Sequence, residues 1–392
     1  MTLESTVSLA KSTLAAAALA ALAASAFAQQ GPVKVGLMLP ATGTFAGLGD
    51  AIEKGFKLYV AEQGGKLAGR EIQYFKVDDE SEPAKATDNV NKLIKRDQVD
   101  VVVGTVHSGV ALAMARAAKE SNTLLIVPNA GADAITGPLC GPNIVRSSFS
   151  NWQPGYASGV MAAQKGYKRA ITIYWNYAAG QESAKGFTEA FTKGGGQIVK
   201  DLTLPFPNVE FQALLTEIAA QKPDVVFAFF AGAGAAKFVK DYDAAGLRKV
   251  APLLGSGFLT DGVLEAQGPS AQGMLTALHY ADGIDTPRNN AFRNKYAVTY
   301  KQQPDVYAVQ GYDAAAILNA GLTAVKGDLK QRDAMAAAMR KTQIDSPRGK
   351  YTLAAAGNPI QDFYIREVKG RENVQTGIAV KVLADPARGC KM

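Results

Sequence analysis

Residues 99–128 read VDVVVGTVHSGVALAMARAAKESNTLLIVP and carry the most informative pattern for the fold class. The two ends of this stretch, 99–106 and 123–128, are apolar runs that are typical of strands buried on both faces of a sheet. The segment between them, 108–120, is predicted to be a helix. A strand, a helix and a second strand in this order indicate a right-handed crossover and therefore a parallel α/β sheet.

The same alternation extends in both directions along the chain. Upstream, strands are predicted at 33–39 and 71–77, and helices at 47–63 and from Pro83. Downstream, strands are expected at 169–175, 197–204, 224–230, 252–258 and 273–280, with helices near 151–166, 180–194, 209–221 and 233–246. Residues 143–149 are interpreted as a crossing segment, 288–343 as three helices and 348–384 as three antiparallel strands. Two α/β halves joined by several short crossings are therefore expected.

The composition is that of an ordinary globular protein. The chain has 392 residues, of which 47% are hydrophobic and 20% charged, and this length suggests two or three domains. No internal apolar stretch approaches the roughly 20 residues that a membrane span needs. The charges behind the net value of +7 are scattered along the chain, so no nucleic-acid partner is expected.

The N-terminal segment has the parts of a secretory signal peptide. Lys11 precedes an alanine-rich apolar run at 12–28, which closes with Ala-Phe-Ala. We predict that the signal peptide, 1–28, is cleaved after Ala28 and that the mature protein is periplasmic; an uncleaved membrane anchor is the alternative. No cysteine follows the run, which excludes a lipoprotein.

The chain has two cysteines, Cys140 and Cys390. In an exported protein such a pair is expected to form a disulfide, and two separate buried thiols are the alternative. The two histidines, His107 and His279, lie at no close spacing to the cysteines, so no zinc site is predicted. The sequence predicts no cofactor.

Motifs of catalysis are missing from the sequence. It contains no G-x-S-x-G nucleophile elbow and no G-x-x-x-x-G-K-[ST] phosphate loop. Gly232-Ala233-Gly234 follows a predicted strand, as in dinucleotide-binding proteins, but Lys237 stands where close helix packing needs a small residue. His107 and Ser108 are adjacent, which is the wrong geometry for a nucleophile and its base. We therefore predict a protein that is not an enzyme.

Six stretches of the sequence are weak signals singly, but together and in this order they are specific for one protein family. They are VKVGLMLPATGTFAGLGD (33–50), VDDESEP (77–83), VVVGTVHSGVALA (101–113), VPNAGAD (127–133), NIVRSSFSNWQ (143–153) and PDVYAVQGYDAA (304–315). With them the whole mature chain resembles the periplasmic solute-binding proteins of branched-chain amino-acid ABC transporters, the leucine/isoleucine/valine-binding type. The resemblance implies a type I fold, in which two doubly wound α/β lobes joined by three crossovers close on a ligand. The expected lobes are 31–148 with 283–347 and 149–282 with 348–392.

The resemblance places a ligand carboxylate against the first lobe. In the family, the loop after the third strand holds this group with a serine, and the matching loop here contains His107 and Ser108. Ser108 would stand at a helix start, where the dipole and free N–H groups favour an anion; a plain N-cap role is the alternative. In the second carboxylate loop, Ala130 can offer backbone groups, whereas Gly131 lacks the hydroxyl of the family.

The resemblance also places apolar side chains at the site. Phe45 and Leu48 match positions that pack on the ligand, and ordinary contacts between the lobes are the alternative. In the second lobe, Tyr177 precedes the position where the family has a tyrosine, which here is Ala179. Phe230, or Phe229 beside it, matches an aromatic position of the pocket.

The second lobe departs from the amino-acid binders in one important respect. Those proteins pair the α-ammonium of the ligand with an acidic side chain, but the matching residue here is Gly257, and Asp261 lies further on. Because a buried ammonium without an anionic partner costs several kcal/mol, such a site should reject zwitterions. A position of Asp261 or Asp282 beside the ligand would contradict this interpretation.

The sequence therefore predicts a monomeric receptor that delivers a small hydrophobic carboxylate to an inner-membrane ABC permease. The favoured ligand is an aromatic acid, such as a benzoate or cinnamate derivative. A branched-chain amino acid is the alternative ligand, and an exported enzyme or a sensor domain is the alternative of a different class. The expected ligand-binding residues are Phe45, Leu48, His107, Ser108, Ala130, Gly131, Tyr177, Ala179, Phe230, Gly257 and Phe258.

Overall fold

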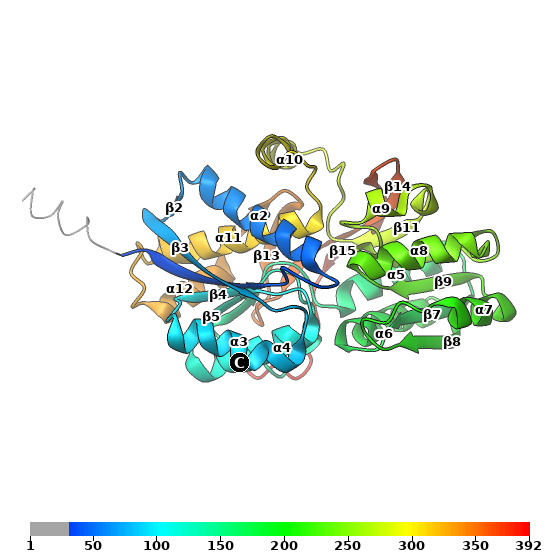
Figure 1. The fold of residues 1–392 in the computed structure, drawn as a ribbon, viewed down its shortest axis with the longest axis horizontal. Helices are drawn as coiled ribbons and strands as arrows, with labels where there is room; N and C mark the ends of the chain where they lie inside the picture. Colours follow the sequence, from blue (N-terminus) through cyan, green and yellow to red (C-terminus); the bar gives the residue numbers. More distant parts are fainter. Residues whose placement is uncertain (1–30) are drawn as a thin grey trace, which may run out of the picture.

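The computed structural model describes residues 31–392, which form two α/β lobes that lie side by side (Figure 1). The predicted signal peptide, 1–28, lies outside the described residues. The first lobe, drawn in blue, cyan and orange, contains the start of the described chain, and the second lobe, drawn mainly in green, contains its middle. Within 31–392, no helix combines the length and the apolar character that a membrane span requires.

The first lobe is built on a six-stranded sheet in the order β2-β3-β1-β4-β5-β6. The strands are β1 (Val33–Leu39), β2 (Lys66–Leu67), β3 (Arg70–Asp78), β4 (Val101–Gly104), β5 (Leu124–Val127) and β6 (Ile144–Arg146). Neighbouring strands run parallel, apart from the antiparallel pair of β2 and β3. Strands β4 and β5 are buried along their whole length, as their unbroken apolar sequences require.

Helices cover both faces of this sheet. The helices of the first lobe are α2 (Ala46–Glu62), α3 (Pro83–Asn91), α4 (Ser108–Ser121), α10 (Pro287–Tyr300), α11 (Val306–Ala324) and α12 (Arg332–Lys341). Alternate side chains of β1 enter two separate cores: Leu37 joins the core under α2 and α11, and Met38 joins the core under α3 and α4. The fold therefore has a helix layer, a sheet and a second helix layer.

The second lobe has a nine-stranded sheet in the order β12-β13-β14-β11-β10-β9-β7-β8, with β15 paired to β14. The strands are β7 (Arg169–Trp175), β8 (Gln197–Leu204), β9 (Val225–Phe229), β10 (Leu253–Ser256), β11 (Leu275–Leu278), β12 (Ile344–Ser346), β13 (Gly349–Leu353), β14 (Pro359–Lys369) and β15 (Glu372–Leu383). Its helices are α5 (Trp152–Gln164), α6 (Ala178–Lys193), α7 (Gln212–Gln221), α8 (Gly232–Ala244) and the short α9 (Leu264–Gln267). Strands β7 to β11 pair in parallel, and β14 joins β11 in antiparallel orientation.

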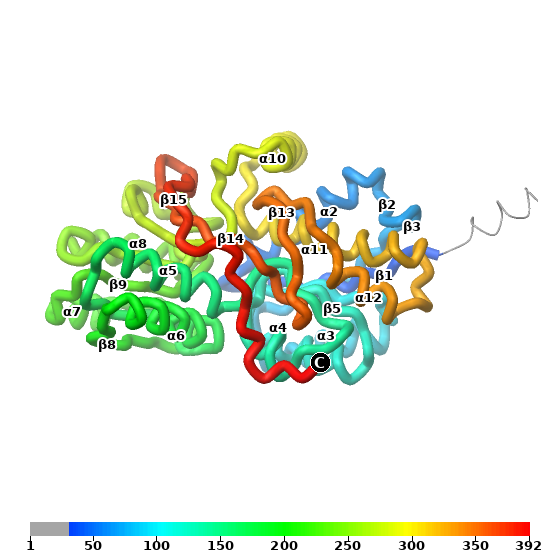
Figure 2. Tube along the Cα trace, turned by 180° about the vertical axis from the view of Figure 1, so that it is seen from behind, coloured from blue at the N-terminus to red at the C-terminus, as the bar shows by residue number. Residues whose placement is uncertain are grey.

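The chain passes between the lobes several times. It runs from β6 to α5 through 147–151, from β11 to α10 through 279–286, and from α12 back to the second sheet through β12 and β13. After β15 the tail returns along the first lobe (Figure 2), where Cys390 forms a disulfide with Cys140. The expected second lobe thus ends in a tail that contacts the first lobe.

One expectation about the strands was wrong. The segment 143–149 contains β6, a paired strand of the first sheet, and the crossing begins only after it. The three antiparallel strands expected in 348–384 are confirmed as β13, β14 and β15, and the short β12 precedes them. Strand β2 was not expected, because a strand of two residues leaves no detectable period in the sequence.

Candidate functional site

The two lobes meet at the carboxyl ends of their parallel strands. Phe45 follows β1 in the first lobe, and Tyr177 follows β7 in the second. Gly232, at the start of α8, comes so close to the first lobe that a Cβ there would lie 2.6 Å from the carbonyl oxygen of Thr44. The lobes are therefore in contact. In α/β sheets this edge is where ligands bind.

Five aromatic rings form an interlobe aromatic cluster: Phe45, His107, Trp175, Tyr177 and Phe206. The His107 imidazole, from the first lobe, stacks on the Tyr177 ring of the second, with centroids 4.7 Å apart and planes at 19°. The Phe206 centroid lies 5.3 Å from that of Phe45 and 4.8 Å from that of His107. The cluster gives the lobe boundary a surface suited to a planar ring, because aromatic groups pack in offset and edge-on arrangements.

His107 is buried and neutral. Burial lowers the pKa of its imidazole to about 4. Its Nδ1 accepts a hydrogen bond of 3.0 Å from the N–H of Gly109, so Nε2 carries the ring proton. His107 thereby caps helix α4, and Ser108 is the first residue of that helix. The alternative interpretation of Ser108, a plain N-cap, is wrong.

The Ser108 hydroxyl is buried and has one hydrogen-bond partner. Nδ2 of Asn151, at the first crossing, donates to its Oγ at 3.2 Å. Because Oγ is the acceptor in this bond, its own O–H stays free to donate to a ligand. The loop before Ser108 is anchored by Asp79, whose carboxylate accepts a hydrogen bond from the Thr105 hydroxyl. Burial raises the pKa of Asp79 to about 6.

The second carboxylate loop offers less than the resemblance implied. The N–H of Ala130 donates to the carbonyl of Thr105 at 2.9 Å, and its carbonyl accepts from Arg146 at 3.3 Å. Both backbone groups are therefore engaged within the first lobe. At Gly131, a Cβ would lie 2.2 Å from Oδ1 of Asn151. The side chain of Asn151 thus takes the space where the family carries a hydroxyl.

A second aromatic group lies at the crossings. The ring of Phe258 is 4.7 Å from that of Phe149 and 6.0 Å from that of Tyr307, between centroids. The hydroxyl of Tyr307 is buried and has no hydrogen-bond partner among residues 31–392. Burial raises its pKa, so it remains a neutral donor. A buried hydroxyl without a partner is unfavourable, and a ligand with an acceptor would relieve this cost.

Leu48 and Ala179 are buried near the boundary of the lobes. Cδ2 of Leu48 lies 3.1 Å from the point where a Cβ of Gly262 would stand, so Leu48 faces a loop of the second lobe. Ala179 is in the first turn of α6, directly after the loop of Tyr177, and is 4% exposed. Both residues therefore lie near the lobe boundary, and their contact with a ligand stays a prediction.

Phe230 and Phe229 both contact the interlobe aromatic cluster. The Phe230 ring packs edge-on against that of Trp175, with centroids 5.2 Å apart, and its other neighbours, Phe211 and Phe238, lie inside the second lobe. The Phe229 ring lies 6.3 Å from that of Tyr177. Contact of either phenylalanine with a ligand stays a prediction.

The space beside Gly257 is filled by an arginine. A Cβ at Gly257 would lie 2.2 Å from Nη2 of Arg366. This buried guanidinium pairs with the Asp261 carboxylate at 2.7 Å and donates to Thr276 Oγ1 at 3.0 Å. The space where amino-acid binders carry an acidic side chain is therefore occupied by the Arg366 guanidinium, which is already paired with Asp261.

Asp261 and Asp282 line a groove of about 980 Å³ beside α2 and α10. None of the expected ligand-binding residues lines this groove. Asp282 lies 3.3 Å from Nη1 of Arg293, and burial raises the pKa of Asp282 to about 6. Arg366 and Arg293 therefore balance the charges of the two carboxylates within the chain, and Oδ1 of Asp261 has no hydrogen-bond partner among residues 31–392.

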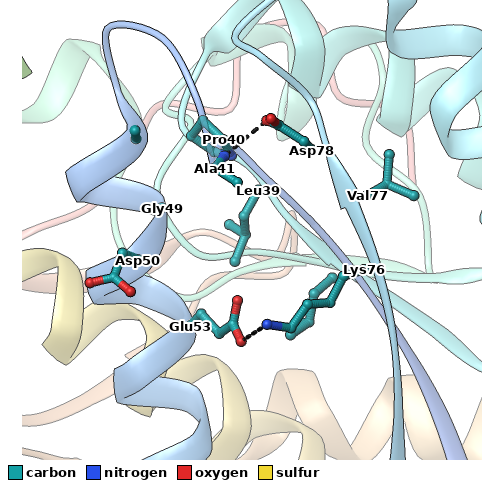
Figure 3. Close-up of a pocket in the computed structure, with 11 residues that line it drawn as sticks. Leu39, Pro40, Ala41, Gly49, Asp50, Glu53, Lys76, Val77 and Asp78 are labelled. Carbon is teal, nitrogen blue, oxygen red and sulfur yellow. Dashed lines mark hydrogen bonds and ion pairs between the residues drawn. The ribbon is translucent and has the colours of Figure 1, made fainter. Parts of the chain in front are cut away.

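A further cavity of about 200 Å³ lies within the first lobe, between β1, α2 and β3 (Figure 3). Its charged groups are satisfied locally: Glu53 pairs with Lys76, and Asp78 accepts from the N–H of Ala41 at 2.9 Å. In the described part of the chain, no group of three His, Cys, Asp or Glu side chains is placed to hold a metal ion.

Five residues at the lobe boundary were not foreseen: Trp175, Phe206, Phe149, Asn151 and Tyr307. Trp175 ends β7 and Phe206 follows β8 in the run Pro-Phe-Pro, and their places at strand ends were the signal that could have found them. The other three belong to the crossing after β6 or to the start of α11. Their proximity to the predicted site depends on how the lobes pack, which no local pattern records.

Comparisons with known proteins agree with this geometry. The profile of the periplasmic binding protein family matches residues 32–373. The Leu/Ile/Val-binding protein homolog 6 of Brucella melitensis is 30% identical over 367 residues, which cover 91% of this chain and 93% of that protein. The solute binding protein of an ABC transporter from R. palustris, solved in complex with benzoate, is 53% identical with a TM-score of 0.91, covering 92% of this chain and 100% of that one. A solute binding protein from Rhodopseudomonas palustris BisB5, solved in complex with 3,4-dihydroxy benzoic acid, is 32% identical with a TM-score of 0.85, covering 91% and 99%.

Two α/β lobes that meet at their strand ends, with repeated crossings between them, form the type I fold, and the family profile makes the chain a solute-binding protein of this fold. This class captures small molecules between its lobes. The chain belongs to the periplasmic binding protein family. The predicted fold and the resemblance to the leucine/isoleucine/valine-binding type are confirmed, and the family and these neighbours are solute-binding receptors.

Proposed function

We propose that this protein is the extracytoplasmic receptor of an ABC importer and that it closes its lobes on an aromatic carboxylate, benzoate or a close derivative. The observation that carries the proposal is the free Ser108 O–H at the lobe boundary that also holds the interlobe aromatic cluster. The R. palustris protein in complex with benzoate, 53% identical to this chain, supports the same ligand class.

Each half of such a ligand has a chemical counterpart in the structure. The carboxylate would accept from Ser108 at the start of α4, where the helix dipole and free N–H groups favour negative charge. The ring would pack among aromatic side chains of both lobes, such as Tyr177 and Phe206. Substituents on the ring would meet a neutral donor in the hydroxyl of Tyr307.

A branched-chain amino acid is the second candidate ligand, because relatives at 30% identity are named Leu/Ile/Val-binding proteins. The charge arrangement argues against it. Arg366 occupies the space beside Gly257, and its guanidinium already balances the charge of Asp261. A zwitterion would bury its ammonium next to this cation without an anion of its own to balance it, at a cost of several kcal/mol.

The ligand class is tested by thermal unfolding of protein that has been unfolded and refolded to remove bound molecules. Benzoate, 4-hydroxybenzoate, 3,4-dihydroxybenzoate, leucine and valine are added one at a time. A ligand at 100 times its Kd stabilises the folded state by about 2.7 kcal/mol, which raises the melting midpoint by several degrees. A rise with the benzoates alone is expected. A rise with leucine or valine and none with benzoates would overturn the proposal.

The proposal extends to export, partner and organisation of the chain. The family supports a periplasmic protein, and we propose cleavage after Ala28, which N-terminal sequencing of the secreted protein tests.

The partner would be an inner-membrane ABC permease, and the protein would be a monomer by size-exclusion chromatography. The lobes would comprise 31–148 with 283–347 and 149–282 with 348–392, which limited proteolysis at the crossings would delimit.

A further inference from the structure

Glu182 bridges the two lobes next to the proposed carboxylate site. It lies on α6 of the second lobe, and its Oε2 accepts a hydrogen bond of 3.0 Å from the N–H of Asp133 in the first lobe. The same oxygen accepts from Nδ2 of Asn151 at 2.8 Å. That amide nitrogen also donates to Oγ of Ser108 at 3.2 Å. One carboxylate therefore connects the second lobe, the first lobe and the serine.

We propose that Glu182 is a positioning residue that couples lobe closure to ligand capture, by accepting hydrogen bonds from the first lobe and from the amide that orients Ser108. The proposal rests on the proposed function and deepens it. When the lobes separate, α6 moves away from the Asp133 backbone, and Asn151 loses an acceptor that fixes its amide. The hydroxyl of Ser108 is then less well oriented for the ligand.

Closure also brings two carboxylates together. The carboxylate of Asp133 accepts from the N–H of Trp152 at 3.1 Å while its own N–H bonds to Glu182. Burial and then the charge of Glu182 raise the pKa of Asp133 to about 7, and burial raises the pKa of Glu182. Two like charges held close in a partly buried site disfavour the state in which both are ionised.

Other charged and titratable groups face Glu182 from the surrounding elements: Arg146 on β6, Asp385 in the tail, and Tyr177 before α6. Arg146 moderates the repulsion, but its guanidinium also bonds to carbonyls of the first lobe, including that of Ala132 at 3.0 Å. Asp385 adds to the repulsion. The net result for both Asp133 and Glu182 is a raised pKa.

The sign of the pH dependence follows. A carboxyl whose pKa is higher in the closed form takes up a proton on closure, so closure is favoured at low pH. Ligand affinity is expected to fall as the pH rises from the ordinary carboxyl range to about 7. His107 acts in the opposite direction, because burial lowers its pKa and disfavours closure of its protonated form. The contribution of Glu182 to the pH dependence of affinity is therefore obtained by comparing variants with the wild type, because the pH profile of the wild type alone also contains the contribution of His107.

The experiment measures benzoate affinity by calorimetry between about pH 5.5 and 8, where benzoate is ionised. For the wild type, Kd is expected to rise about 3- to 10-fold over this range. Glu182→Gln keeps an acceptor oxygen without the charge, so its Kd should rise less steeply and should not exceed the wild-type value at pH 8. Glu182→Ala removes the acceptor and should weaken binding about 10-fold at every pH.

Glu189→Gln is the matched control. Glu189 lies two turns later on α6 and accepts from Nε1 of Trp152 at 2.9 Å, but its pKa is lowered despite partial burial, by hydrogen bonds from Trp152 and Arg388. Its pH profile should equal that of the wild type. Thermal unfolding without ligand verifies that each variant is folded.

Different results contradict the role of Glu182 and the proposed function. A wild-type profile in Glu182→Gln, or full affinity in Glu182→Ala, overturns the role of Glu182 and leaves the proposed function intact. Failure of the wild type to bind benzoate overturns the proposed function. In that case small-angle X-ray scattering without ligand decides the role of Glu182: the wild type should be more compact at pH 5.5 than at pH 8, and equal behaviour of Glu182→Gln overturns it.

Discussion

Lobe closure can be tested at Gly232, where the second lobe touches the backbone of the first. A Cβ there would lie 2.6 Å from the carbonyl oxygen of Thr44 and 3.2 Å from Cδ1 of Phe45. The first atom belongs to the main chain and cannot rotate away. In Gly232→Ala the lobes must therefore separate by nearly 1 Å to restore an ordinary contact, and overpacking of this kind costs about 1–3 kcal/mol.

This cost falls on the closed form alone, so we expect benzoate affinity to drop between about 5-fold and 150-fold. Gly232 also has a positive φ of 56°, which is unfavourable for alanine by about 1–2 kcal/mol. That second cost is present whether the lobes are open or closed. It lowers the free energy of unfolding and leaves the affinity unchanged.

Gly246→Ala separates the two effects. Gly246 has a φ of 71°, and a Cβ added there would meet no other segment of the chain within 4 Å, so alanine has the backbone cost without a contact between lobes. Calorimetry with benzoate and urea unfolding without ligand are measured for both variants. Equal affinities in Gly232→Ala and Gly246→Ala would show that the contact between Gly232 and Thr44 does not form when the ligand binds, and the reasoning would be refuted.

Three further predictions follow from the site and the tail. Ser108→Ala should weaken benzoate binding by about 1–3 kcal/mol in calorimetry, because a hydrogen bond to the carboxylate is lost; an unchanged Kd would remove Ser108 from the site. Gly257→Asp should lower the midpoint of thermal unfolding without creating leucine binding, because its Cβ would lie 2.2 Å from Nη2 of Arg366; a gain of leucine binding would contradict this. Mass spectrometry of the non-reduced protein should find Cys140 linked to Cys390, and reduction should lower the free energy of unfolding by about 2–4 kcal/mol; two alkylatable thiols would rule the bond out.

Most of the fold was predictable from local patterns. Apolar runs such as 33–39 and 169–175 coincide with β1 and β7 as the structure has them. A strand buried on both faces must be apolar throughout, so its sequence alone reveals it. The segment 143–149 was misinterpreted because this signal needs length. Strand β6 has only three residues, and so short an apolar run is hard to distinguish from a connection.

The candidate site was predictable only in part. Ser108 and Tyr177 stand at strand ends, and the edge of a parallel sheet collects such residues at one place. Phe230 was expected at the pocket, and its ring packs against Trp175 of the interlobe aromatic cluster as well as against Phe211 inside the second lobe. The absence of an acid at Gly257 was visible, but the arginine that fills its space is more than 100 positions away in the chain.

The alternation of strands and helices, the strand-end loops and the loss of an acid for an ammonium group could all be deduced from the chain alone. These features depend on residue type and on spacings of a few positions. The three-dimensional packing was needed to show which rings meet between the lobes, that Arg366 is paired with Asp261, and that Glu182 reaches both Asp133 and Asn151. These contacts join segments that are far apart in the chain, within one lobe or across the two, and their approach is set by the packing of whole sheets and helices, which leaves no local trace in the sequence.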